Sequence, residues 1–158
     1  MTHIDDDLYA RIVRQMPIPC VDLYVLDDED HLLMVKRRNE PAAGEWWFPG
    51  GRVLFGETRQ EAAERKLKEE CGLVGKFRSF VGTFDAILLV PDNGISHAIT
   101  TVVFLRVSSR QTVVLDEQSS DYRWAPVDEW RHHHQWSSSD LGWLAKSIID
   151  LALAGESV

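Results

Sequence analysis

The chain has 158 residues, a length that fits one domain over residues 1–158 with a core large enough to fold alone. Its 44% hydrophobic and 27% charged residues are typical of a globular protein, and no apolar run approaches the roughly 18 residues of a membrane span. The formal net charge of −8 disfavours a general nucleic-acid surface, because it would repel a phosphate backbone, but permits a local arginine pocket for one phosphorylated ligand.

The N-terminal part of the chain predicts a short helix followed by a β-hairpin. Residues 1–7 are acidic, whereas a secretion signal would be basic and followed by an apolar core, so we expect a cytoplasmic protein. An amphipathic helix over 5–14 ends before two prolines. Apolar strands follow at 21–26 and 31–36, joined by a charged turn at 27–30.

The rest of the chain predicts one long helix, paired strands and a closing helix. Glu57–Cys71 contains no Gly or Pro and stops at Gly72, a position typical of a left-handed C-terminal cap. The other expected elements are strands at 77–90, 96–107 and 121–125, a turn at 91–94, and a helix at 141–154 with an apolar face of Leu144, Ile148, Leu151 and Ala152. This pattern predicts an α/β (α+β) fold with a mixed sheet and helices packed on it.

Three glutamates lie in the C-terminal half of the long helix, where the helix dipole disfavours carboxylates. Glu64, Glu69 and Glu70 would each cost about 0.3–1 kcal/mol there. A hard cation such as Mg²⁺ would compensate them, and Gly50-Gly51 presents bare backbone just before this helix. The alternative is a solvated helix face neutralised by cationic side chains of the same helix, namely Arg65, Lys66 and Lys68.

The spacing of these residues favours the first interpretation. Eight of the nine fixed positions in the pattern Gly-x5-Glu-x7-Arg-Glu-apolar-x-Glu-Glu-x-Gly-apolar are present, and only Lys66 departs, standing where the pattern has Glu. The matching residues are Gly51, Glu57, Arg65, Leu67, Glu69, Glu70, Gly72 and Leu73. The segment 51–73 therefore resembles the catalytic loop and helix of the Nudix hydrolase superfamily.

This resemblance implies a fold, a cofactor and an assembly. The fold is a Nudix-like α/β/α sandwich with a mixed β-sheet. The implied cofactor is Mg²⁺, with Mn²⁺ as a substitute, bound near Glu69, Glu70 and the Gly50 carbonyl. Arg65 is expected to pair with Glu57 and hold the helix. We also expect a homodimer, because similar hydrolases commonly dimerise, and a small-molecule partner rather than nucleic acid or membrane.

Residues outside the segment resemble one branch of the superfamily, the GDP-mannose mannosyl hydrolases. They are Pro19–Asp22, Lys36-Arg37, Pro41-Ala42, Gly44, Trp46–Val53, Asp116–Gln118 and Asp121–Trp124. The resemblance implies that Arg37 and Arg52 bind a diphosphate, that Asp22 lies near the substrate, and that Gln118 joins Gly50 and Glu70 around the metal. Arginine's planar fork suits phosphate oxygens. We therefore expect Mg²⁺-dependent hydrolysis of a nucleoside diphosphate linked to another moiety, such as the nucleotide sugar GDP-mannose.

Departures from that branch leave the reaction open. Ser119 stands where the branch has a histidine that acts as general base, and serine does not accept a proton near neutral pH. Glu69 supplies a carboxylate that the branch can lack, and Glu117 adds another. Each of these two residues is a candidate to bind metal or to orient water. Water can attack the sugar C1, or it can attack phosphorus in a nucleotide sugar or (d)NTP, as in a pyrophosphatase. Lys66 and Ser119 favour a third possibility, a nucleotide-sensing domain without turnover.

The cysteines, the histidines and the Trp46-Trp47 pair are expected mainly to have structural roles. Cys20 and Cys71 have no metal-ligand or redox spacing, and we expect no disulfide. The run His132–His134 is expected in a surface turn, because consecutive helical residues do not share a face. His97 is either a turn or edge residue or a substitute base. The pair Trp46-Trp47 is expected in the core, with stacking on a base as the alternative.

Overall fold

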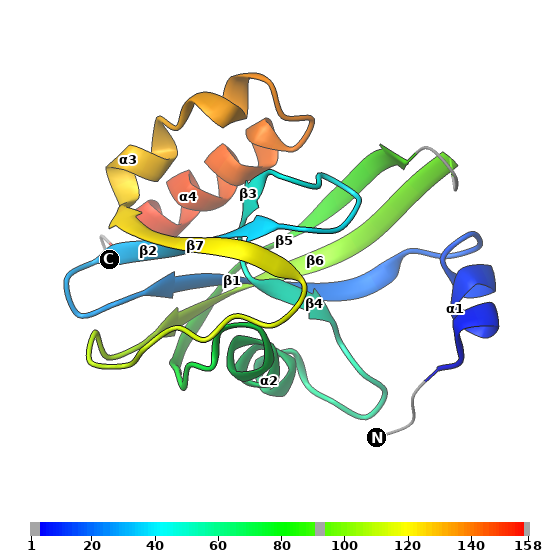
Figure 1. Ribbon diagram of the computed structural model, residues 1–158, viewed down its shortest axis with the longest axis horizontal. Coiled ribbons are helices and arrows are strands. Elements are labelled where there is room, and N and C mark those ends of the chain that lie inside the picture. The colour runs from blue at the N-terminus through cyan, green and yellow to red at the C-terminus, as the bar shows by residue number, and fades with distance from the viewer. Residues whose placement is uncertain (1–3, 91–93, 157–158) are drawn as a thin grey trace.

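A computed structural model describes residues 4–90 and 94–156 and shows a mixed sheet between two helical layers (Figure 1). The strands are β1 (Ile18–Leu26), β2 (His31–Arg37), β3 (Trp46–Trp47), β4 (Gly50–Arg52), β5 (Lys76–Val90), β6 (Gly94–Arg106) and β7 (Ser119–Pro126). The helices are α1 (Asp6–Ile12), α2 (Arg59–Cys71), α3 (Val127–Arg131), the 3-10 helix η1 (His134–Ser137) and α4 (Gly142–Glu156). The first part of the acidic start and most of the expected turn at 91–94 lie outside the described residues.

The sheet has seven strands, and its main order is β3-β2-β1-β6-β5. β1 and β6 run parallel in register from Ile18 opposite Ala98 to Leu26 opposite Arg106, and the other pairs are antiparallel. The first half of β1 also pairs with β4, so that Asp22 lies opposite Gly50. β1 is thus the strand that connects the glycine turn to the centre of the sheet.

Two apolar clusters fix the helices on the two faces of the sheet. On one face, α2 packs Ala62, Ala63 and Leu67 against buried residues of β1, β2 and β6. On the other face lie α3 and α4 (Figure 1), with η1 between them in the chain. The buried side chains of these helices include Trp130, Trp136, Leu144 and Ile148. This layering confirms the expected α/β/α sandwich with a mixed sheet. Burial of these apolar residues supplies most of the driving force for the arrangement.

The structure differs from the sequence-based prediction mainly at short elements. β1 starts at Ile18 rather than at residue 21, because its first residues pair with β6 and β4. The strands β3 and β4 and the helices α3 and η1 were not predicted, since two to five residues show no periodicity. In α4, Leu144, Ile148 and Ala152 are buried, but Leu151 is 48% exposed, so its assignment to the apolar face was wrong.

Candidate active site

Helix α2 is positioned by caps at both ends. The Thr58 side chain accepts from the Glu61 amide, and the Glu61 side chain accepts from the Thr58 amide, which completes a capping box. At the other end, Gly72 adopts φ 67°, the left-handed conformation expected from the sequence. The apolar side of α2 faces the sheet, and four of its charged residues, Arg65, Lys66, Glu69 and Glu70, line a cavity.

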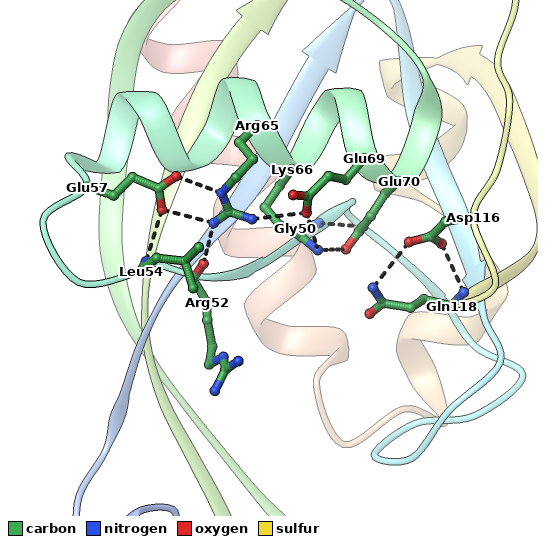
Figure 2. A network of polar contacts seen from close by, with 10 residues as sticks. All are labelled: Gly50, Arg52, Leu54, Glu57, Arg65, Lys66, Glu69, Glu70, Asp116 and Gln118. Atoms are coloured by element: carbon green, nitrogen blue, oxygen red, sulfur yellow. Dashed lines mark hydrogen bonds and ion pairs between the residues drawn. The ribbon is translucent and has the colours of Figure 1, made fainter. Parts of the chain in front are cut away.

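An ion pair fastens the preceding loop to α2 (Figure 2). Arg65 donates from Nε to Glu57 Oε1 at 2.6 Å, and from Nη2 to Glu57 Oε2 and to the Arg52 carbonyl, each at 2.9 Å. Glu57 Oε2 also accepts from the Leu54 amide at 2.9 Å. The Arg65 hydrogen bonds hold the pKa of Glu57 below its usual range, although partial burial opposes this. The geometry is the one expected for the Arg65–Glu57 pair.

The carboxylates Glu69 and Glu70 project from α2 toward Gly50, with Lys66 between them (Figure 2). Lys66 Nζ lies 2.6 Å from Glu70 Oε1 and 3.7 Å from Glu69 Oε2, and Arg65 Nη1 donates to Glu69 Oε2 at 3.0 Å. The Gly50 amide donates to Glu70 Oε2 at 3.0 Å. Burial raises the pKa of Glu70, and the Lys66 charge opposes that rise. Of the three neutralising cations suggested by the helix sequence, Arg65 and Lys66 therefore contact these carboxylates, whereas Lys68 is exposed.

A cavity of about 640 Å³ brings this cluster together with distant residues of the chain. Its lining includes Asp22, Arg37, Arg52, Glu69, Glu70 and Gln118. The Arg52 guanidinium stacks on Tyr9 at 4.2 Å from the ring centroid, and its Nη1 is buried without a hydrogen-bond partner. Arg37 donates from Nε to the Pro41 carbonyl at 2.8 Å. An unpaired buried donor is costly, so Arg52 is suited to bind an anion in this cavity.

Asp22 lies in the wall of this cavity on β1. Its Oδ1 accepts from Trp47 Nε1 at 3.2 Å, and its Oδ2 accepts from the Thr100 hydroxyl at 3.0 Å. Burial raises the pKa of Asp22 to about 6, against the effect of these two hydrogen bonds and of Arg37, while the Glu70 charge raises it further. Thr100, which the sequence analysis did not identify, reaches Asp22 only because β6 pairs with β1.

The loop before β7 contributes Gln118 to the cavity, whereas Glu117 is exposed and does not line it. The Gln118 backbone amide and side-chain Nε2 donate to the two Asp116 oxygens at 2.9 and 3.2 Å (Figure 2). The Asp116 amide donates to the Glu70 carbonyl at 3.2 Å. Asp116 thus ties this loop to the end of α2, a role that the sequence pattern did not reveal. Ser119 is buried beside the cavity.

A sequence profile of the NUDIX domain matches residues 16–146. The chain belongs to the NUDIX family. This membership confirms the family that the spacing of segment 51–73 predicted.

Curated relatives of the chain carry several names. The chain is 43% identical over 84 residues to the low-salt glycan biosynthesis protein Agl8 of Haloferax volcanii, with 53% of each chain covered. It is 35% identical over 81 residues to an ADP-ribose pyrophosphatase of Methanocaldococcus jannaschii, covering 51% of this chain and 46% of that one. The chain therefore spans about half the length of these two relatives. It is 32% identical over 119 residues to a putative 8-oxo-dGTP diphosphatase 2 of Mycobacterium tuberculosis, covering 72% and 77%.

Solved structures of the family share the fold at low sequence identity. A NUDIX hydrolase from Nitrosomonas europaea superposes with a TM-score of 0.69 at 21% identity, covering 89% of this chain and 90% of that one. The NUDIX domain of Shewanella oneidensis NrtR, complexed with ADP ribose, gives 0.63 at 21% identity, covering 89% and 88%. These likenesses show that the seven-stranded sheet and its helices form the NUDIX fold.

NUDIX hydrolases generally use divalent metal ions, and the donor types at this site suit one. The two α2 carboxylates and the Gln118 amide oxygen face one cavity, and such oxygen donors are preferred by hard divalent cations. Within residues 4–90 and 94–156, however, no three His, Cys, Asp or Glu side chains converge on one point. The site thus provides the oxygen ligands that divalent cations prefer. It has one carboxylate fewer than the family pattern, because Lys66 stands where that pattern has a glutamate.

The remaining sequence candidates lie away from the site or in the core. His97 is absent from the cavity lining, whereas its neighbours Ser96 and Ala98 belong to it, because side chains alternate along β6. His97 faces Asp85 instead, with Nε2 at 3.7 Å from Oδ1. Trp47 is buried, as expected, and also lines the cavity.

The histidine run and the cysteines show no sign of a metal or redox site. His133 caps η1 and packs on Trp130, so the run forms part of a tight helical turn. Cys20 and Cys71 are free thiols. In the described part of the chain, no helix is both long enough and apolar enough to cross a membrane.

Proposed function

We propose that this NUDIX protein is a Mg²⁺-dependent hydrolase, for which Mn²⁺ can substitute, that cleaves a nucleoside diphosphate linked to another moiety, with a nucleotide sugar such as GDP-mannose as substrate. The observation that carries the proposal is the cavity that Arg37 and Arg52 line together with the carboxylates of α2. Its volume of about 640 Å³ lies within the range of small-molecule sites, roughly 300–1,000 Å³. Arginines beside carboxylates suit a diphosphate that brings a divalent cation with it.

Each candidate residue has a distinct proposed role. Gly50, Glu69, Glu70 and Gln118 would hold the metal, which when bound supplies charge neutralisation and an activated water. Arg37 and Arg52 would bind the diphosphate oxygens and stabilise negative charge on the leaving group. Glu57 and Arg65 would position α2. Glu117, being exposed beside Gln118, would at most orient water at the cavity edge.

Ser119 cannot act as the general base at the position where the related branch has a histidine. Asp22 is the best candidate for that proton acceptor. Its two hydrogen bonds come from the neutral donors Trp47 and Thr100, and its raised pKa of about 6 lies close to neutral pH. A general base works best when its pKa is near the working pH. The two α2 carboxylates are instead paired with cations.

The two candidate reactions differ in the atom attacked by water. Attack at the sugar C1 releases GDP and mannose, and the similarity to a glycan biosynthesis protein is compatible with a nucleotide-sugar substrate. Attack at phosphorus releases a nucleoside monophosphate. The presence of Glu69 and the pyrophosphatase and diphosphatase names of other relatives favour this second reaction or a (d)NTP substrate.

The deciding experiment is turnover of GDP-mannose with Mg²⁺ in ¹⁸O-labelled water, followed by mass analysis of the products. Label on mannose indicates attack at C1, and label on a phosphate indicates attack at phosphorus. Glu70→Gln is expected to lose at least about 100-fold in kcat, because it weakens metal binding. Glu64→Gln, the same change on the exposed side of α2, should retain activity. Nucleotide binding without turnover of any nucleotide substrate would contradict the proposal and favour a sensing domain.

We also infer a homodimer located in the cytoplasm. The long hairpin of β5 and β6 exposes the apolar side chains Ile87, Leu89, Ile95 and Ile99, which a second copy could cover. Sedimentation equilibrium of the full chain tests the assembly, and a concentration-independent monomer would contradict it.

A further inference from the structure

Lys66 is a buried cation at the centre of the candidate metal site. It occupies the position where the NUDIX pattern has a glutamate, and its side chain is only 9% exposed. Its Nζ lies 2.6 Å from Glu70 Oε1, and the Glu70 side chain is 6% exposed. Water screens such a pair little, so the attraction between the two charges is strong. Lys66 also stays close to the backbone turn, because a Cβ added at Gly51 would lie 2.7 Å from its Cε.

Hydrogen-bond donors already occupy most of the carboxylate oxygens that a metal would use. Glu70 Oε1 contacts Lys66, and Glu70 Oε2 accepts from the Gly50 amide. Glu69 Oε2 is shared by Arg65 at 3.0 Å and Lys66 at 3.7 Å. Of the four oxygens, only Glu69 Oε1 has no such contact in the described part of the chain. A cation that binds Glu70 must therefore displace an existing positive charge or lie beside it.

We propose that Lys66 is an internal counter-cation that competes with the divalent ion for Glu70. This inference rests on the proposed metal-dependent function, because it concerns the same carboxylates. Where the pattern has a glutamate that adds one negative charge, this chain has a lysine that adds one positive charge. The cluster is thus two units more positive than the family pattern, and its carboxylates already face two cations, Arg65 and Lys66, without metal. The protein therefore binds free divalent ions weakly, and removal of the Lys66 charge increases its affinity for them.

The test measures binding of Mn²⁺ alone, by isothermal titration calorimetry and by electron paramagnetic resonance of free Mn²⁺ at pH 8. Lys66→Met keeps the length of the side chain and removes the charge, and Lys66→Gln is a second variant that can still donate to Glu70. We expect both to bind Mn²⁺ roughly tenfold more tightly than the wild type, or better, because a neighbouring like charge has been removed. Lys68→Gln is the matched control, since it makes the same change in net charge on the exposed side of α2.

Thermal unfolding provides a readout that does not depend on turnover. In EDTA, Lys66→Met should unfold at a lower temperature than the wild type, because Glu70 then remains buried without its cation. Saturating Mn²⁺ should raise its Tm by at least roughly 3 °C more than it raises the Tm of the wild type. Lys68→Gln should respond as the wild type does.

The outcomes separate this inference from the proposed function. Equal Mn²⁺ affinity in the wild type and both Lys66 variants overturns the inference but leaves a metal-dependent hydrolase intact. Failure of all proteins to bind Mn²⁺ overturns the inference as well. Tighter binding in the Lys66 variants supports the inference, even if none of the proteins hydrolyses a nucleotide.

Discussion

Asp22 offers a direct test of the electrostatics of the site, because burial of its charged carboxylate in the cavity lowers the stability of the folded protein. Replacement by Asn keeps the size of the side chain, and an amide can still accept from Trp47 and donate to the Thr100 hydroxyl in place of the present hydrogen bonds. Asp22→Asn therefore removes the charge while preserving the contacts.

The raised pKa of Asp22 sets the sign and size of the effect. Its pKa is about 6 in the folded protein, compared with an ordinary value of 3.8. The folded state thus holds the proton more tightly, so the contribution of Asp22 to the stability of the wild type is most favourable below pH 3.8 and is lost as pH rises through 6. The shift corresponds to about 3 kcal/mol at about 1.36 kcal/mol per pKa unit. Because water in the cavity screens part of this cost, we expect Asp22→Asn to be more stable than the wild type by about 2 kcal/mol at pH 8, with the difference vanishing near pH 3.5.

Urea denaturation at both pH values measures the difference in free energy of unfolding. Asp140→Asn, which alters an exposed carboxylate in the turn before α4, is the control. At pH 8 the same Asp22 variant should lose turnover if Asp22 is the proton acceptor, so it would gain stability while losing activity. An equal difference in stability between the two proteins at pH 3.5 and pH 8 would refute the argument, because the charge would then carry no cost.

Three further predictions concern the supports of the site. Arg65→Lys should lower the free energy of unfolding by about 1–3 kcal/mol in urea titrations, because an ammonium cannot make the four hydrogen bonds of the planar guanidinium; an unchanged midpoint would contradict this. Gly50→Ala should lower Tm by several degrees, because the added Cβ would lie 2.2 Å from a backbone oxygen of β1. Gly155→Ala, where the added Cβ meets open space, should leave Tm unchanged, and equal changes in Tm for the two variants would contradict the predicted clash. Burial raises the pKa of both Cys20 and Cys71 to about 12, so Ellman's reagent at pH 8 should modify them rapidly only in urea.

The sequence alone determined the local parts of this protein. The long helix, its glycine cap and the pairing of Arg65 with Glu57 follow from residue types at short spacing, although the helix begins at Arg59 after the Thr58 cap rather than at Glu57, and the same spacing identified the family. The long strands were also recognisable from their β-branched and aromatic content. Short elements such as β3 and β4 were not, since they exist only through pairing with β2 and β1.

Tertiary structure decided which residues share the cavity and how they are charged there. Asp22, Thr100 and Gln118 are far apart in the chain and meet the end of α2 only because β1 pairs with β6 and β4, and the loop before β7 folds back. The sequence could place Lys66 one helical turn from Glu70, but not show that both are buried. Burial reduces screening by water, and it turns an ordinary surface pair into a strong contact at the candidate metal site.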